Sequence, residues 1–245
     1  MPTLTVIIPT FNEESLVEGA LHSVLFADEI IVIDSFSVDG TQDISKRYAS
    51  KFLQRKFDNF SNQKNFALKQ ASSDWVLFLD AEERVTHSLE MEIKETIANT
   101  KHSGFKINFP HFFMNRFLYF ESDTVIRLVK REGSSYTGDV HEKLQVSGSV
   151  GTLKNDMIHY TYKGLQNFIE KREVYAWFQA GQLLNKGTKP TLFKMMYRPA
   201  FRFFKSYVLK GGFRDGIPGL AVAAITSYGV FQRYAKLVLL QKGMR

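Results

Sequence analysis

The stretch WVLFLDAEERV, residues 75–85, decides the fold because an apolar run ends there directly at a cluster of acids. The run VLFL is typical of a strand that is covered on both faces of a sheet. Asp80, Glu82 and Glu83 follow it without a spacer. Ionised carboxylates at the edge of a core are costly unless a positive charge meets them. A lysine, a helix end or a metal ion could supply that charge, and this stretch alone leaves the three open.

Strand and helix periods alternate along the first hundred residues. We expect helices at 12–27, 39–49 and 61–71, between strands at 4–10, 29–34, 51–57 and 75–80. Asn12 is available as the N-cap of the first helix. This alternation predicts βαβ units with right-handed crossovers, and therefore a parallel sheet with helices on both faces.

Polar residues gather at the carboxyl ends of these strands. Asp34 ends the second strand, Asp80 ends the fourth, and the loop at 10–12 follows the first. Open α/β sheets bind their ligands along this edge. Asp and Asn at strand ends also cap the helices that follow them. A ligand site and a set of helix caps are therefore both compatible with the pattern.

The spacing of Asp80 and Glu82 suits a hard divalent cation, because alternate side chains can reach one ion and oxygen ligands favour Mg²⁺ or Mn²⁺. Lys64 lies at the start of a helix on the same edge and could hold an anionic diphosphate. Short acidic pairs are also common on solvated surfaces. A metal-binding role is favoured for this pair because an apolar strand precedes it and because Asp34 and Asn12 lie on the same edge.

The strict alternation then stops. Three later stretches are strand-like and indicate mixed or antiparallel additions to the sheet: 104–110, 123–131 and 157–162. After Gly164 the pattern becomes helical. We therefore expect an α/β domain at 1–165 and a helical, basic C-terminal region at 166–245.

The composition is that of a folded protein, with 44% hydrophobic residues in a chain of 245. Cysteine is absent from the sequence, which excludes disulfides and cysteine metal sites and suits a reducing compartment. The N-terminal sequence has no basic region and its apolar run breaks at Pro9. We therefore expect no secretory signal and a cytoplasmic location.

The net charge of +7 is concentrated in the tail, where residues 185–245 carry twelve Lys or Arg and one acid. From 193 to 210, basic residues recur opposite aromatic and methionine residues. A solvated or packing helix, a nucleic-acid patch and a helix at a membrane interface are all possible. We favour the membrane surface and no nucleic acid, because basic residues beside aromatics are typical of interfacial helices. The apolar stretch 216–231 is too short to predict a membrane span.

Five motifs, taken in order, resemble the GT-A core of the family 2 inverting glycosyltransferases. The resemblance is strongest to the branch that contains the bacterial lipopolysaccharide-core β-1,4-glucosyltransferases. It covers roughly residues 3–165 and rests on TVIIPTFNEE, IVIDSFSVDGT, NQKNFAL, WVLFLDAEE and VHEKL. The resemblance implies a GT-A fold, which is a Rossmann-like α/β mixed sheet, here with a helical C-terminal extension. It also implies a nucleotide-sugar donor and a divalent metal, Mg²⁺ or Mn²⁺.

The resemblance implies roles for individual residues. The nucleotide pocket would be lined by residues that follow the first two strands: Pro9, Thr10, Asn12, Glu14, Asp34 and Asp39. Asp80 and Glu82 stand at the family's Asp-x-Asp metal motif, and His159 is the matching candidate to complete the metal site or touch the diphosphate. Glu142, the last residue of VHE, would be the catalytic base.

Two positions depart from the family pattern. Ser35 stands where many relatives have a second Asp, so a uracil contact is not implied there. His141 precedes Glu142 where an acid is usual, so His141 could share or modify the role of the base. Simpler alternatives are a salt bridge for Glu142 and a core position for His159.

The resemblance therefore predicts an enzyme that moves a hexose, with glucose from UDP-glucose as the leading choice, to a lipid-anchored glycan such as lipopolysaccharide core. An acceptor hydroxyl attacks the anomeric carbon while the nucleotide diphosphate leaves, so a carboxylate must take a proton and a cation must neutralise the leaving group. We expect it to act at the inner face of the cytoplasmic membrane. The alternatives are a polyprenyl-phosphate glycosyltransferase, a phosphate-binding regulatory module and an inactive scaffold of the same fold.

Overall fold

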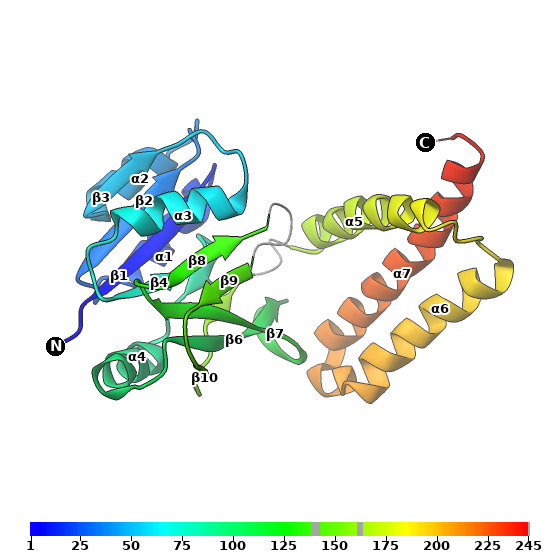
Figure 1. Cartoon of the computed structure of the whole chain (residues 1–245). Coiled ribbons are helices and arrows are strands. Elements are labelled where there is room, and N and C mark those ends of the chain that lie inside the picture. The colour runs from blue at the N-terminus through cyan, green and yellow to red at the C-terminus, as the bar shows by residue number, and fades with distance from the viewer. Residues whose placement is uncertain (139–142, 161–163, 245) are drawn as a thin grey trace. The chain divides into compact units, whose positions relative to one another are not determined.

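The computed structural model of the chain describes residues 1–138, 143–160 and 164–244. The chain forms two compact units (Figure 1). The first comprises Met1–Pro110 with Asp123–His159, and the second comprises His111–Ser122 with Tyr160–Arg245.

The first unit is built on one mixed sheet that contains the expected βαβ units. Its strands lie in the order β3 (Lys51–Gln54), β2 (Glu29–Asp34), β1 (Leu4–Thr10), β4 (Trp75–Phe78), β7 (Arg116–Lys130), β6 (Gly104–Phe113), β11 (Ile158–His159) and β5 (Glu83–Arg84). Strands β1 to β4 are parallel to one another, whereas β7 joins β4 and β11 joins β5 in antiparallel pairs. The predicted α/β mixed sheet is therefore confirmed.

Two smaller strand pairs complete this unit. β10 (Val150–Thr152) runs parallel to β6. β8 (Ser134–Thr137) and β9 (Lys143–Val146) form a separate antiparallel pair. The aromatic sequence between the two strands expected at 104–110 and 123–131 extends both of them, so that β6 and β7 are longer than predicted.

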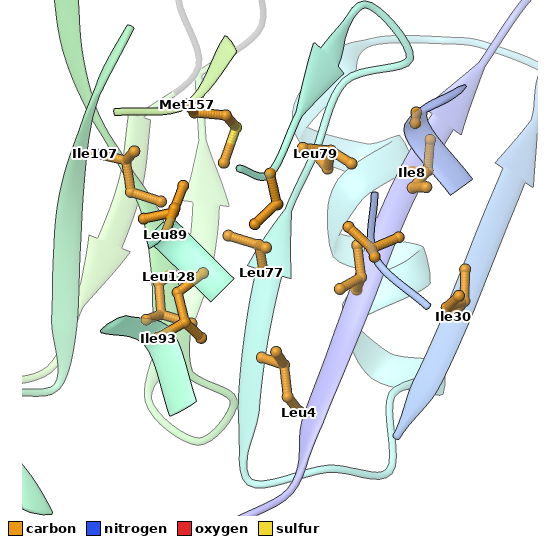
Figure 2. Close-up of a cluster of buried hydrophobic side chains, with 14 of the residues drawn as sticks. Leu4, Ile8, Ile30, Leu77, Leu79, Leu89, Ile93, Ile107, Leu128 and Met157 are labelled. Carbon is orange, nitrogen blue, oxygen red and sulfur yellow. The ribbon is translucent and has the colours of Figure 1, made fainter. Parts of the chain in front are cut away.

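Helices bury the central strands from both sides. α1 (Glu14–His22) and α4 (His87–Asn99) pack with Leu4, Ile8 and Leu77 in one cluster (Figure 2). The intervening residues Ile7 and Phe78 belong to a second cluster, to which α3 (Phe60–Gln70) contributes. Because alternate strand residues point to opposite faces, both faces are apolar, and each large side chain buried contributes about 1.5–3 kcal/mol. This explains the unbroken apolar runs in the sequence.

The prediction that Asn12 caps the first helix is wrong. The N-cap position is Glu13, which makes no side-chain capping hydrogen bond. Asn12 has a left-handed backbone with φ of 53°, and its Oδ1 accepts a hydrogen bond from the Val38 amide at 2.9 Å. The side chain is thereby directed to the loop between β2 and α2 (Thr41–Tyr48) and ties the loops after β1 and β2 together.

The second unit is mainly helical, with α5 (Leu165–Asn185), α6 (Leu192–Phe204) and α7 (Gly216–Gln241) (Figure 1). Its aromatic core joins Phe113, Leu118 and Phe120 of the β6–β7 hairpin to Phe168 and Val222. Pro199 lies inside α6, and none of the residues of that helix is buried. Across the described part of the chain, no helix has the length and hydropathy of a membrane span, α7 included.

Candidate active site

A cleft of about 680 Å³ opens at the carboxyl ends of β1 and β4, within the first unit. Its walls come from the end of β1, from the segments that follow β1, β2, β3 and β4, and from the first turns of α3. Five residues selected from the sequence line it together: Pro9, Thr10, Lys64, Asp80 and Glu82. The sheet edge at which the sequence placed a ligand site is thus the edge that carries a cleft.

Asp80 lies between two cations. The Arg127 guanidinium bonds to Asp80 Oδ2 at 2.7 Å, and Lys64 Nζ lies 4.0 Å from Asp80 Oδ1. Lys64 is buried, and its ammonium also lies over the Tyr136 ring, 5.0 Å from the centroid. Burial by itself would raise the pKa of Asp80, but Arg127 and Lys64 outweigh it and hold that pKa well below its usual range. Asp80 is therefore ionised at physiological pH.

Glu83 is a second, buried carboxyl group that Arg127 contacts. It bonds to Arg127 at 2.6 Å through Oε1, and its Oε2 accepts a hydrogen bond from the Asp80 amide at 2.8 Å. Burial raises the pKa of Glu83 to about 7, and the Asp80 charge adds to this against the opposing effect of Arg127. One guanidinium thus serves two carboxyl groups, of which one is fully ionised and the other changes its charge near neutral pH.

His159 is brought next to Glu82, a residue of the cleft lining, by the pairing of β11 with β5, in which His159 lies opposite Glu83. Its Nε2 lies 2.9 Å from Glu82 Oε1. Burial would lower the pKa of His159, but the hydrogen bond with Glu82 and the nearby carboxylates raise it overall. The two residues are 77 positions apart in sequence, so only the antiparallel pairing brings them together.

Aromatic rings form another part of the cleft lining, contributed by Phe11, Phe57 and Phe60. All three are more than two-fifths exposed, and the rings of Phe57 and Phe60 contact edge to face at 4.9 Å. Beside them, Gln63 Nε2 donates to Ser35 Oγ at 3.1 Å. Exposed rings beside polar groups suit the stacking of a planar ring with hydrogen bonds at its edge.

Four residues expected at the nucleotide pocket form hydrogen bonds that connect the segments following β1 and β2. Asp34 is fully buried and accepts hydrogen bonds from the Thr10 hydroxyl at 3.0 Å and the Ser37 amide at 2.8 Å. Asp39 accepts from the amide of Glu14 at 3.2 Å, and the Glu14 carboxylate accepts from the Gly40 amide at 3.2 Å. Asn12 bridges to Val38 as described above. A direct contact of these four with a donor stays a prediction.

The expected catalytic base, Glu142, and its neighbour His141 lie outside the described residues. The flanking strands β8 and β9 are described, and they pair from Ser134–Val146 to Thr137–Lys143. The role of Glu142 therefore stays a prediction from the motif.

The fit of a metal ion can be tested on the side chains that are present. Among the described residues, no group of three or more His, Asp or Glu is gathered to hold a metal ion. Asp80 and Glu82 both face the cleft, but Asp80 is paired with Arg127, and Glu82 with His159. The donor types, two carboxylates and an imidazole, match Mg²⁺ or Mn²⁺. The residues therefore suit such an ion chemically, although in this arrangement they form two separate pairs.

Arg127 is the charged residue of this site that sequence reasoning missed. It lies 47 positions from Asp80 and 44 from Glu83, on the antiparallel strand β7. The available signal was a single arginine inside the apolar run VIRLV, at a position whose neighbour Leu128 is fully buried. A charge at a core position of a strand needs a buried counter-charge, and the acids after β4 are that counter-charge.

Comparison with known proteins shows the family and the fold of the chain. The model of the family described as Glycosyl transferase family 2 matches residues 5–154. The lipopolysaccharide core biosynthesis glycosyltransferase LpsC of Rhizobium meliloti (strain 1021) is 26% identical over 253 residues, which cover 95% of this chain and 93% of that protein. The poly(ribitol-phosphate) beta-N-acetylglucosaminyltransferase TarS of Staphylococcus aureus (strain Mu50 / ATCC 700699) is 28% identical over 173 residues, which cover 66% of this chain and 26% of TarS.

Solved structures agree on the fold. The mannosyltransferase PcManGT from Pyrobaculum calidifontis, in complex with GDP-Man and Mn²⁺, matches with a TM-score of 0.57 at 15% identity, covering 97% of this chain and 87% of that one. The same fold is found in S. aureus TarS 1–349 in complex with UDP-GlcNAc, with a TM-score of 0.50 at 14% identity, covering 99% of this chain and 92% of that one. The family model spans more than half of the chain, and it includes β1, β4 and Asp80. The chain therefore belongs to glycosyl transferase family 2 and is a glycosyltransferase with the GT-A fold.

Proposed function

We propose that the enzyme is an inverting hexosyltransferase that uses a nucleotide-diphosphate sugar, with UDP-glucose as the leading donor, and a lipid-anchored glycan such as lipopolysaccharide core as acceptor. The observation that carries the proposal is the joint presence of Lys64, Asp80 and Glu82 in the cleft at the ends of β1 and β4. The similarity to LpsC, a lipopolysaccharide core biosynthesis glycosyltransferase, supports the acceptor class.

The described side chains suggest how a donor is held. Lys64 is fixed near Asp80 by burial, and its charge would stabilise the diphosphate that develops as the leaving group departs. Phe11, Phe57 and Phe60 offer faces on which a base or sugar ring can stack. Glu142 is our candidate for the base that takes the proton from the acceptor hydroxyl.

We further propose that Asp80 and Glu82 hold a divalent cation, with His159 as the third group. Such an ion, when bound, supplies positive charge to the departing diphosphate. PcManGT, which has the same fold, was solved with Mn²⁺, and this agrees with the proposal. Asp80 is already neutralised by Arg127. The competing proposal is therefore that Lys64 and Arg127 stabilise the departing diphosphate without a metal ion.

We also propose that the enzyme lies on the inner face of the cytoplasmic membrane through α6. Apolar side chains of that helix are strongly exposed: Leu192 by 78%, Phe193 by 73% and Met196 by 63%. Exposed aromatics and methionines beside basic residues suit the boundary between headgroups and acyl chains. Each Lys or Arg near an anionic leaflet adds about 1 kcal/mol.

The experiment that tests the function measures donor binding and turnover across UDP-, GDP-, ADP- and TDP-sugars, with Mn²⁺, with Mg²⁺ and with a chelator. Asp80→Asn and Glu142→Gln are compared with Glu95→Gln, which changes an exposed carboxylate on α4, away from the cleft. We expect one donor to bind. Asp80→Asn should lose Mn²⁺ binding, and Glu142→Gln should bind the donor without turnover, while Glu95→Gln behaves as wild type.

Two outcomes would change the assignment. Full activity in chelator, with no calorimetric binding of Mn²⁺, would remove the metal and favour Lys64 and Arg127 as the stabilising charges. Failure to bind any nucleotide sugar under all conditions would contradict the donor class.

A further inference from the structure

The second unit contains a cavity of about 330 Å³ to which the proposed function assigns no role. Its lining comes from α5, α6, α7 and the turn after α6, the three helices that Figure 1 shows in this unit. Six of the side chains that line it carry a positive charge or an amide: Arg172, Gln179, Arg198, Arg202, Lys205 and Arg233. The volume is at the small end of ligand cavities, which range over roughly 300–1,000 Å³.

Five of these six residues are cations, and none of the described residues that line the cavity is an acid. The described acids of residues 160–245 are engaged elsewhere. Glu173 pairs with Lys236 at 3.3 Å, Asp215 lies 3.8 Å from Arg116, and Glu170 accepts from Gln166 at 2.8 Å. The positive charge of the cavity is therefore not balanced by these carboxylates.

Four of the cations, Arg172, Arg198, Lys205 and Arg233, form no ion pair with a described carboxylate. Arg233 is held in place by a hydrogen bond from Nη1 to Gln179 Oε1 at 3.1 Å, while its buried Nε has no partner among the described residues. Burial lowers the pKa of Arg233, and the charges of Arg198 and Arg202 lower it further. Gathering these charges costs stability unless an anion offsets them.

We propose that this cavity binds a phosphate-bearing anion between its guanidinium groups. The planar fork of arginine matches the oxygen geometry of phosphate and can donate two parallel hydrogen bonds, so several converging forks favour phosphate over a monovalent ion. Phe201 and Val230 add apolar surface to the lining. The phosphate can come from a free phosphate or diphosphate, or from the headgroup of a lipid. The proposal does not depend on the reaction assigned to the first unit.

The test is calorimetric titration of the whole chain with inorganic pyrophosphate and with inorganic phosphate, with divalent cations removed by chelator. A parallel series measures sedimentation with vesicles of phosphatidylcholine alone and with added phosphatidic acid. The cavity variant Arg172→Gln/Arg233→Gln is compared with Lys186→Gln/Arg214→Gln, which removes the same charge at exposed positions outside the cavity. Thermal unfolding of each protein without ligand accompanies both series.

We expect the cavity variant to weaken binding about tenfold or more, since each charge-assisted hydrogen bond that is lost weakens affinity severalfold, and the control variant to change it less than about twofold. Loss in the pyrophosphate series assigns a soluble phosphate, and loss only in the phosphatidic acid series assigns a lipid headgroup. Without ligand, the cavity variant should melt no lower than wild type, because it relieves repulsion between like charges.

Three results would overturn the proposal. Equal weakening in the two variants would mean that binding follows general surface charge. Absence of binding in both series would mean that the cavity is not a phosphate site. A cavity variant that keeps binding but melts well below wild type would mean that the arginines serve the packing of the three helices.

Discussion

Replacing Arg127 with methionine is the most informative single change, because one guanidinium serves both Asp80 and Glu83. Methionine keeps much of the apolar volume but leaves two carboxyl groups without their cation, and Glu83 is only 1% exposed. Removing one partner of a buried ion pair costs about 3–5 kcal/mol. In a domain of this size 1 kcal/mol corresponds to about 2–4 °C in Tm, so we expect Tm to fall by about 6–20 °C at pH 8.

The pKa values of Glu83 and Asp80 predict how the stability loss of this variant changes with pH. Glu83 has a folded pKa of about 7, above its ordinary value of 4.5, so the folded state takes up a proton as the pH falls from 8 towards 5. Stability then rises with acidification over that window. Without Arg127 the pKa of Asp80 loses its main lowering influence, so protonation of the folded variant is favoured further. The deficit of the variant relative to wild type should therefore shrink as the pH falls from 8 to 5.

Differential scanning calorimetry at several pH values measures this deficit. Arg47→Met, at an exposed position of α2, is the matched control and should change stability by less than about 0.5 kcal/mol. A deficit below about 1 kcal/mol at pH 8, or one that grows on acidification, would refute the reasoning that Arg127 is the counter-charge of both acids.

Three other predictions concern single side chains. Lys64→Met should weaken donor binding by about tenfold in calorimetry through loss of a charge-assisted contact, whereas exposed Lys69→Met should leave it unchanged. The pKa of His159 is raised in the folded state, so its pairing with Glu82 adds stability that is present below pH 6.5 and is lost as the pH rises through the folded pKa. His159→Gln should therefore reduce the dependence of the free energy of unfolding on pH over that range. Phe193→Ser should reduce sedimentation with anionic vesicles without lowering Tm, because Phe193 is 73% exposed, and a fall in Tm with unchanged sedimentation would contradict a membrane role.

The sequence by itself determined the order of elements from β1 to β4 and the location of the cleft. Strand and helix periods alternate through β1 to β4, and parallel strands bring their carboxyl ends to one edge. Pro9, Thr10 and Asp80 therefore had to lie near one another whatever the details of packing. Local pattern and chirality are enough for this, since each step connects neighbours in the chain.

Only the tertiary structure decided which charges meet at that edge. Arg127 and His159 arrive on the antiparallel strands β7 and β11, whose register with β4 and β5 depends on packing across the whole sheet. A one-residue slip would turn each side chain to the opposite face. Asn12 shows the same effect at a single residue. Its left-handed backbone directs a side chain that could cap a helix to a neighbouring loop. Contacts that depend on strand register or on one backbone dihedral angle are determined by the packing of the whole folded molecule. Residue patterns in the sequence therefore do not predict them.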